Sequence, residues 1–269
     1  MSSVRFMSLS SGSCGNCYWF GSEAGGILID AGVSLRRLKS GLQAAGLGMD
    51  SFSAVLVTHD HLDHIRDLGS YCKKLCRPVY ATPTLHAALA HHSFAAPYIT
   101  GCRRDLEEGA WNEIGPFLVH AFTVPHDATQ TSGFAILHEG YKFVIMTDIG
   151  RMTDEAVALA SQADAVVVES NYDMDMLMGG PYTHELKMRI CQGNGHLSND
   201  ECASAIRRFW HPGLKHLFLC HLSENNNTHE LAYTCSKKAL DDLGVAPGTV
   251  HLVALPRQYP SPLFTLRSE

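Results

Sequence analysis

Apolar stretches and polar breaks alternate along the whole chain, and their lengths separate strands from helices. Short apolar runs bounded by Gly, Pro, Ser or Asn are typical of buried strands, particularly when they are rich in Val, Ile and Phe. By this criterion we expect strands at 4–9, 26–29, 54–57, 78–81, 111–124 with a turn at 115–116, 131–137, 141–146, 165–168, 215–220, 250–255 and 262–266.

Apolar residues that recur three or four positions apart predict amphipathic helices between these strands. The first carries Leu35, Leu38 and Leu42 behind Ser34, which can cap it. A methionine-rich stretch at 174–178 is expected to be a loop that fills a gap. Further helices are expected at 64–75, 84–91, 154–160, 184–191, from Ser198 or Asn199 to 210, and at 230–243.

Composition narrows the class of protein. The chain has 269 residues, of which 45% are hydrophobic, enough to build a sizeable core in one large or two small domains. A net charge of −6 without a polycationic tail argues against strong non-specific binding to nucleic acid, although a local basic groove stays open. No apolar signal region or bilayer-length apolar run is present, so we interpret the nine scattered cysteines as reduced thiols of a cytoplasmic protein.

Candidate chemistry is concentrated directly behind the strand at 54–57. His59, His61 and Asp63 occupy alternating positions, and residues two apart in an extended segment project to one side. If a helix begins near His64, that imidazole turns away from the point where the other three side chains converge and can serve a second binding position close by. Neutral imidazole and carboxylate are the usual ligands of zinc, iron and manganese, so the segment predicts a metal-binding site.

The run His59-x-His61-x-Asp63-His64 resembles the HxHxDH signature of the metallo-β-lactamase fold hydrolases. The resemblance implies a further His, then an Asp after a strand, then a last His after another strand. It also implies an α/β protein (α+β by some schemes), with residues 1–269 in a single four-layer αββα sandwich of two mixed β-sheets. The chain supplies the remaining ligands in the implied order as His126, Asp148 and His221.

By the same resemblance two divalent ions are expected, with zinc, manganese and iron left as alternatives. The implied arrangement is one ion on His59, His61 and His126, the other on Asp63, His64 and His221, and Asp148 bridging both. A strand-end Asp such as Asp148 can equally cap a helix, and we interpret it here as the bridge. His221 is preferred to His196 as the last ligand because it directly follows an apolar strand.

His196 precedes a predicted helix and resembles the His that supports catalysis in the ribonuclease Z-like branch. A role in orienting a ligand carboxylate is an equal alternative. Two cations about 3.5–4 Å apart can lower the pKa of a shared water toward about 7, without a Ser or Cys nucleophile. Asp63 and His196 are therefore the candidate catalytic residues, the first accepting a proton from water and the second protonating the leaving oxygen.

Motifs outside the ligands resemble the WalJ/YycJ-type branch, which implies a phosphodiesterase that works as a metal-dependent 5′→3′ exonuclease on DNA. The motifs lie at 10–17, 59–64, 195–199 and 221–226, and together they span most of the chain. The glycine-containing loop at 10–17 suggests a phosphate contact, with a plain hairpin connection as the alternative. The polar run at 225–228, at a helix start, suggests another, with a capping turn as the alternative. The expected substrate-contacting residues are Ser13, Asn16, Ser223, Asn225 and Asn226.

Other functions on the same residues stay open. A hydrolase of a small ester, thioester or lactone is the main alternative, and a non-catalytic metal-binding regulator is disfavoured because the ligand set is complete. DNA is the expected partner, with neither a membrane nor an obligate protein partner. Candidate phosphate contacts are the pairs Arg103-Arg104, Lys187 with Arg189, Arg207-Arg208 and Lys237-Lys238.

Overall fold

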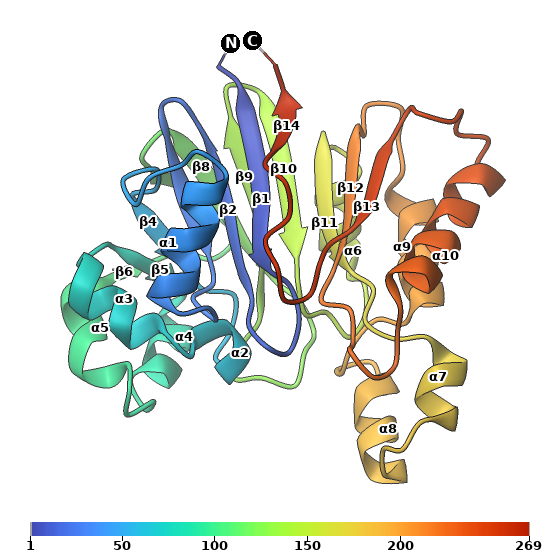
Figure 1. The fold of residues 1–269 in the computed structure, drawn as a ribbon, viewed down its shortest axis with the longest axis horizontal. Coiled ribbons are helices and arrows are strands. Elements are labelled where there is room, and N and C mark those ends of the chain that lie inside the picture. Colours follow the sequence, from blue (N-terminus) through green and yellow to red (C-terminus); the bar gives the residue numbers. More distant parts are fainter. Residues whose placement is uncertain (1, 269) are drawn as a thin grey trace.

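Two seven-stranded β-sheets lie face to face in the computed structural model, which describes residues 2–268 (Figure 1). The first sheet has the strand order β14-β1-β2-β3-β4-β5-β6. Its strands in chain order are β1 (Val4–Ser10), β2 (Cys17–Ser22), β3 (Gly25–Ile29), β4 (Ala54–Leu56), β5 (Val79–Ala81), β6 (Arg103–Asp105) and β14 (Phe264–Arg267).

The second sheet has the order β13-β12-β11-β10-β9-β8-β7. Both sheets are mixed, because β3 to β6 and β10 to β13 pair in parallel while the remaining neighbours pair antiparallel. The strands of the second sheet are β7 (Trp111–Ile114), β8 (Phe117–Thr123), β9 (Ser132–His138), β10 (Tyr141–Met146), β11 (Ala165–Glu169), β12 (His216–Cys220) and β13 (His251–Ala254).

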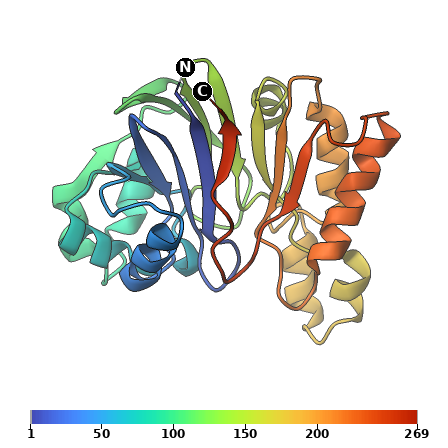
Figure 2. The same ribbon diagram turned by 45° about the horizontal axis from the view of Figure 1, so that its top comes forward.

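Helices cover the outer face of each sheet and complete a four-layer αββα sandwich, as the resemblance implies (Figures 1 and 2). Parallel strands need crossover connections, and helices supply them here. Over the first sheet lie α1 (Leu35–Ala44), α2 (Leu62–Ile65), α3 (Leu68–Leu75), α4 (Pro83–Leu89) and α5 (Ala96–Cys102). With the second sheet lie α6 (Asp154–Ala160), α7 (Met174–Gly179), α8 (His184–Cys191), α9 (Asn199–Phe209) and α10 (His229–Asp242).

Aromatic side chains fill the space between the sheets. Phe6 packs against Phe143 and Phe218 with ring centroids 5.2 and 4.9 Å apart, and Phe20 packs against Phe143 at 4.6 Å. All four rings are fully buried. Burying a side chain of this size contributes about 1.5–3 kcal/mol, so this layer holds the two sheets at a fixed spacing and fixes the position of the loops at their edge.

The sequence predictions of strands and helices are wrong in four places, the first being β2 (Cys17–Ser22), which was not predicted. The single helix expected at 64–75 is divided into α2 and α3, since the Asp67 backbone N–H donates to the Ala31 carbonyl at 3.0 Å at the break. The methionine-rich stretch is the short helix α7, which Asp173 caps by accepting a hydrogen bond from the Met176 N–H at 2.9 Å. Helix α5 and strand β6 were not predicted, because neither carries a periodic apolar pattern.

Several strands end at one edge of the sandwich, and the loops that follow them build the site. His59 follows β4, Asp148 follows β10, and His221 follows β12. In Figures 1 and 2, α7 and α8 project beyond the strand ends on this side of the molecule. The arrangement agrees with the rule that ligand sites in such sheets lie at the carboxyl ends of parallel strands.

Candidate metal centre

The loop after β4 is shaped by a buried carboxylate and a close chain crossing. Asp30 accepts hydrogen bonds from the Thr58 N–H at 2.8 Å and from the Thr58 hydroxyl at 2.9 Å. Gly32 lies so close to the Asp63 carbonyl that a Cβ at this position would collide with it. Consequently the segment stays extended through His61 and becomes helical at Leu62, which turns Asp63 and His64 toward the site.

Backbone and carboxylate acceptors fix how the histidine rings of the site are protonated. His126 Nδ1 lies 2.7 Å from the Gly195 carbonyl oxygen, and His64 Nδ1 lies 2.7 Å from Asp30 Oδ2. Since each acceptor must receive a proton, Nδ1 carries it in both rings, and Nε2 faces the site. This is how carboxylates and carbonyls orient metal-binding histidines.

His59, His61 and His126 form the first group that can hold a metal ion, with one nitrogen of each within 4.8 Å of the others. His61 Nε2 donates to the Asp127 carbonyl oxygen at 3.3 Å, so its Nδ1 faces His126 Nε2 across 3.2 Å. His59 is fully buried, and its Nε2 has no hydrogen-bond partner. A buried nitrogen without a partner is costly, and a divalent cation at the centre of this group would satisfy it.

Asp63, His64 and His221 form the second group, and Asp148 lies between the two. His64 Nε2 is 3.1 Å from Asp148 Oδ2, and His221 Nε2 is 3.4 Å from Asp63 Oδ2. Burial alone would lower the pKa of His64, but the nearby carboxylates, first Asp148 and then Asp30, raise it well above its usual value. Burial would likewise raise the pKa of Asp148, whereas His221 and His64 lower it. The cluster therefore favours positive charge, which is the condition for holding a cation.

Glu169, at the end of β11, is one residue of the site that sequence reasoning missed, and Asp30 is another. Glu169 Oε1 accepts hydrogen bonds from His196 Nδ1 at 2.7 Å and from His221 Nδ1 at 2.9 Å. It is fully buried, and its pKa is lowered, because the charge of His196 outweighs the effect of burial. A signal was available: Glu169 and Asp30 each follow an apolar strand, the same pattern that identified Asp148.

The structure brings His196 and His221 to the same carboxylate. Their ring centroids are 5.3 Å apart, but only His221 reaches the second metal group, through Asp63. His196 belongs to a separate group with Asp148, Glu169 and His221. The geometry therefore favours His221 as the ligand and leaves His196 Nε2 free to face the pocket.

A cavity of about 390 Å³ opens beside these residues. One wall carries the metal-site residues, and another is built by α8 and the connection before it. Arg66 and Arg189 also line the cavity, and Arg189 is paired with Asp127 at 2.5 Å. The lining residues are Ser13, His61, Leu62, Asp63, Arg66, Asp127, Asp148, Asn171, Tyr182, Leu186, Arg189, Ile190, Gly195, His196, His221 and Ser223.

The expected substrate contacts are divided among this cavity, the interior and, for Asn225, the exposed surface. Ser13 and Ser223 line the cavity. Asn16 is buried, and its amide donates to Asp63 Oδ2 at 3.1 Å, so it positions a candidate ligand. Asn226 is buried against the Ser223 hydroxyl, and Asn225 donates to the Tyr182 hydroxyl at 2.9 Å.

Residues 26–221 match a family model described as a beta-lactamase superfamily domain. The chain belongs to the metallo-β-lactamase superfamily. Within this superfamily it is 34% identical to the exodeoxyribonuclease YycJ of Bacillus anthracis over 245 residues, which cover 91% of this chain and 92% of that protein. It is 31% identical to the exodeoxyribonuclease WalJ of Streptococcus pneumoniae over 243 residues, 90% of each chain. These relatives confirm the WalJ/YycJ-type branch.

Among solved structures, the metallo-β-lactamase fold protein YhfI from Bacillus subtilis superposes with a TM-score of 0.70 at 16% identity, covering 97% of this chain and 99% of that one. At this identity the match confirms the fold alone. Family membership and the His/Asp cluster together make this metallo-β-lactamase superfamily member a metal-dependent hydrolase. Within residues 2–268, no helix is long and apolar enough to span a bilayer.

Proposed function

We propose that this metallo-β-lactamase superfamily member is a dinuclear 5′→3′ exonuclease that hydrolyses phosphodiester bonds in DNA. The observation that carries the proposal is its similarity, over about nine-tenths of its length, to two proteins named exodeoxyribonucleases. The two adjoining ligand groups beside one cavity support a site with two metals. The direction of cleavage follows from the resemblance to the branch.

The ligand groups would hold the two cations as the resemblance implies, with Asp148 between them. When bound, such ions activate water and neutralise the charge of a phosphate undergoing displacement. Asp63 lines the cavity, where it can accept the proton of the attacking water. Burial would raise the pKa of this carboxyl group, but His64 and His221 lower it, so Asp63 is ionised at neutral pH.

His196 is suited to donate a proton to the leaving oxygen. Burial would lower its pKa, but the Glu169 carboxylate raises it above its usual value, which favours the imidazolium form. Nδ1 is committed to Glu169, and the ring lines the cavity, which leaves Nε2 as the donor. Transfer of one proton to the leaving oxygen would return His196 to its neutral form without breaking the bond to Glu169.

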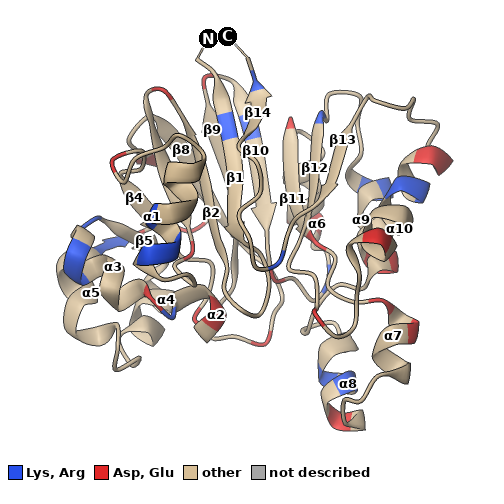
Figure 3. Cartoon of the chain, in the orientation of Figure 1, with Lys and Arg blue, Asp and Glu red and all other residues tan. Residues whose placement is uncertain are grey.

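The arginine side chains that line the cavity support an anionic substrate. Arg66 and Arg189 both line the cavity beside the metal groups; among the described residues Arg66 has no carboxylate partner, whereas Arg189 is paired with Asp127. Elsewhere basic residues are spread over many elements, with acidic residues among them (Figure 3). Of the basic pairs named from sequence, four members are held by carboxylates outside the cavity: Arg103 by Asp105, Arg207 by Asp242, Arg208 by Asp154 and Lys237 by Asp241. The cavity is therefore the favoured point of phosphate contact.

The test is hydrolysis of end-labelled linear DNA, single- and double-stranded, by metal-stripped protein resupplied with manganese or zinc. We expect release of nucleotides from 5′ ends only after metal is added. Asp63→Ala should abolish the activity. Asp60→Asn is the matched control, since its carboxylate bonds only to Thr129, at 2.7 and 3.2 Å, and it should retain activity.

Failure to cleave any DNA with either metal, by protein that binds two ions per chain, would overturn the nuclease proposal. Hydrolysis of thioesters or lactones by the same preparation would then identify the alternative function. Binding of a single ion per chain in an active preparation would overturn the dinuclear part of the proposal alone.

A further inference from the structure

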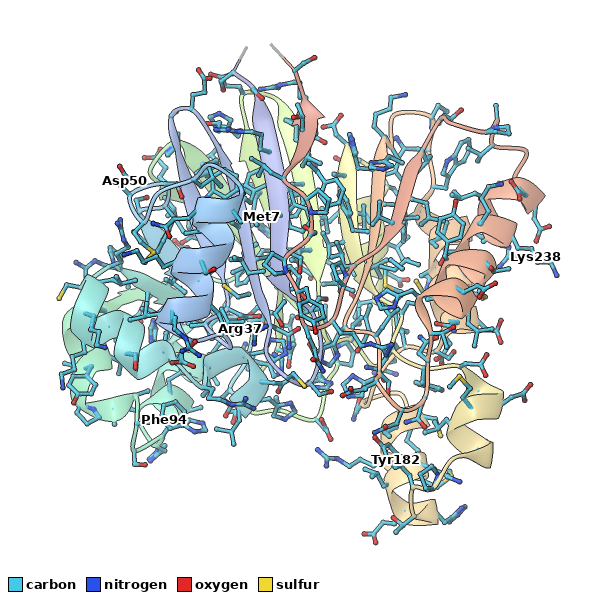
Figure 4. The ribbon with its side chains drawn as sticks, in the orientation of Figure 1. Met7, Arg37, Asp50, Phe94, Tyr182 and Lys238 are labelled. Carbon is cyan, nitrogen blue, oxygen red and sulfur yellow. The ribbon has the colours of Figure 1, made fainter. Side chains whose placement is uncertain are left out.

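The cavity beside the metal groups has two chemically different walls. The metal-site wall is polar and charged. A second part of the lining comes from the α7–α8 projection, meaning residues 174–191. It presents the ring of Tyr182 and the aliphatic side chains of Leu186 and Ile190, together with Arg189, which is paired with Asp127. Figure 4 shows Tyr182 on this projection, below the strand ends. An apolar, aromatic surface is not needed to hold metals or phosphate, so this wall calls for a separate explanation.

The α7–α8 projection is fixed at its base and is therefore a built surface. The Asp173 N–H donates to the Asn226 carbonyl at 2.7 Å where α7 begins, and the His196 N–H donates to the Ile190 carbonyl at 2.9 Å where α8 ends. Lys187 Nζ ties the two helices together through the Met178 carbonyl at 2.7 Å. The position of the wall is thus coupled directly to the backbone of His196.

Tyr182 has its hydroxyl anchored while its ring stays available. It lies in the connection between α7 and α8, and its hydroxyl accepts a hydrogen bond from Asn225 Nδ2 at 2.9 Å. This bond fixes where the ring lies. The ring lines the cavity and is only partly buried, so one face can still accept a flat partner.

We propose that Tyr182 stacks on the base of the nucleotide that is being released, with Leu186 and Ile190 completing the base-binding wall. The inference rests on the proposed exonuclease function and adds its specificity-determining contact. The cavity of about 390 Å³ is near the lower end of the range for small-ligand sites, about 300–1,000 Å³, which suits one nucleotide.

Stacking explains the wall because every base has a π face, so an aromatic platform accepts any sequence. Hydrogen-bonding groups that read base edges would instead make cleavage sequence-dependent. Among the cavity-lining side chains outside the metal groups, the polar ones are the hydroxyls of Ser13, Ser223 and Tyr182, the amide of Asn171, the His196 imidazole, the Arg66 guanidinium, and the paired Asp127 and Arg189. In this arrangement the phosphate of the released nucleotide lies at the metal groups and its base lies on Tyr182, Leu186 and Ile190.

The experiment compares Tyr182→Ala and Tyr182→Phe with the wild-type protein on two single-stranded oligonucleotides. One carries a normal 5′-terminal base and the other an abasic 5′-terminal residue with the same phosphate. Loss of a stacking contact should lower kcat/KM for Tyr182→Ala on the normal substrate roughly 5- to 150-fold. On the abasic substrate both variants and wild type should be equal. On the normal substrate Tyr182→Phe, which keeps the ring but loses the bond to Asn225, should lose less than Tyr182→Ala.

Equal losses of Tyr182→Ala on the normal and the abasic substrate would overturn the stacking proposal, because the ring would then act only in supporting the fold. So would a loss in Tyr182→Phe as large as that in Tyr182→Ala, since the hydroxyl bond to Asn225 would then be what matters. If the wild-type protein cleaves neither substrate, the proposed exonuclease function itself fails, and that outcome is recognisable before any variant is compared.

Discussion

The substitution Asp30→Asn tests whether a carboxylate that touches no substrate controls metal binding. Asp30 is fully buried and has φ +64°, a conformation that Asn tolerates, so the backbone should not change. The amide keeps one oxygen for the Thr58 N–H. The amide nitrogen, however, would replace the oxygen that lies 2.7 Å from His64 Nδ1. In the wild-type protein this Nδ1 already carries a proton. Two donors would then face each other.

The simplest relief is for His64 to move its proton from Nδ1 to Nε2. That nitrogen is 3.1 Å from Asp148 Oδ2 and belongs to the second metal group, and a protonated nitrogen cannot be a ligand. Removing such a supporting group typically lowers metal affinity or activity 10- to 100-fold, which corresponds to about 1.4–2.7 kcal/mol. We expect a loss of this size at one of the two ions, with the first group of histidines affected less.

The assay is calorimetric titration of metal-stripped Asp30→Asn with zinc or manganese, beside wild type and Asp60→Asn. Asp60 undergoes the same chemical change next to the same ligands, but its carboxylate bonds only to Thr129. Circular dichroism of each protein checks that the fold is retained. Wild-type affinity for both ions in Asp30→Asn, with the fold intact, would refute the argument that Asp30 sets the protonation of His64.

Three further predictions follow from other groups. Glu169→Gln would place an amide N–H either against both His196 and His221 or against the backbone N–H groups of Ile149 and Leu197. We therefore expect kcat to fall about 10- to 100-fold in steady-state assays, and an unchanged kcat would contradict its orienting role. Chelation of the metals should lower the Tm by about 5–10 °C in a thermal melt. The reason is that a ligand at 100 times its Kd adds about 2.7 kcal/mol to the free energy of unfolding. An unchanged Tm would show that the carboxylates need no cation. Burial lowers the pKa of His216 to about 4, so its contribution to stability is present above pH 6.5 and is lost as the pH falls toward 4. In urea unfolding, the free energy of unfolding should therefore fall less between pH 7 and pH 5 for His216→Gln than for wild type. The difference should stay below about 1.36 kcal/mol per pH unit, because the ring is partly exposed. Equal losses in the two proteins would exclude His216 as the origin of the pH dependence.

Local sequence determined the strands, most of the helices and the order of the candidate ligands. An apolar run such as 165–168 forms a strand wherever it is buried, and alternation places His59, His61 and Asp63 on one side whatever the rest of the chain does. Strand-end position also favoured His221 over His196 before any distance was known. The strand and helix predictions were largely confirmed because each depends on neighbours a few residues apart, and the ligand assignments stay predictions.

Only the tertiary structure decided which distant groups meet. Asp30 and Glu169 are as close to strand ends in the sequence as Asp148, but their roles come from lying against His64, His196 and His221 across long loops of chain. Tyr182 likewise became part of the cavity only because α7 and α8 fold back toward His196. Strand periodicity specifies to which side of the strand each side chain points. The packing of the two sheets decides which of these side chains from distant segments meet, and that packing depends on the whole core.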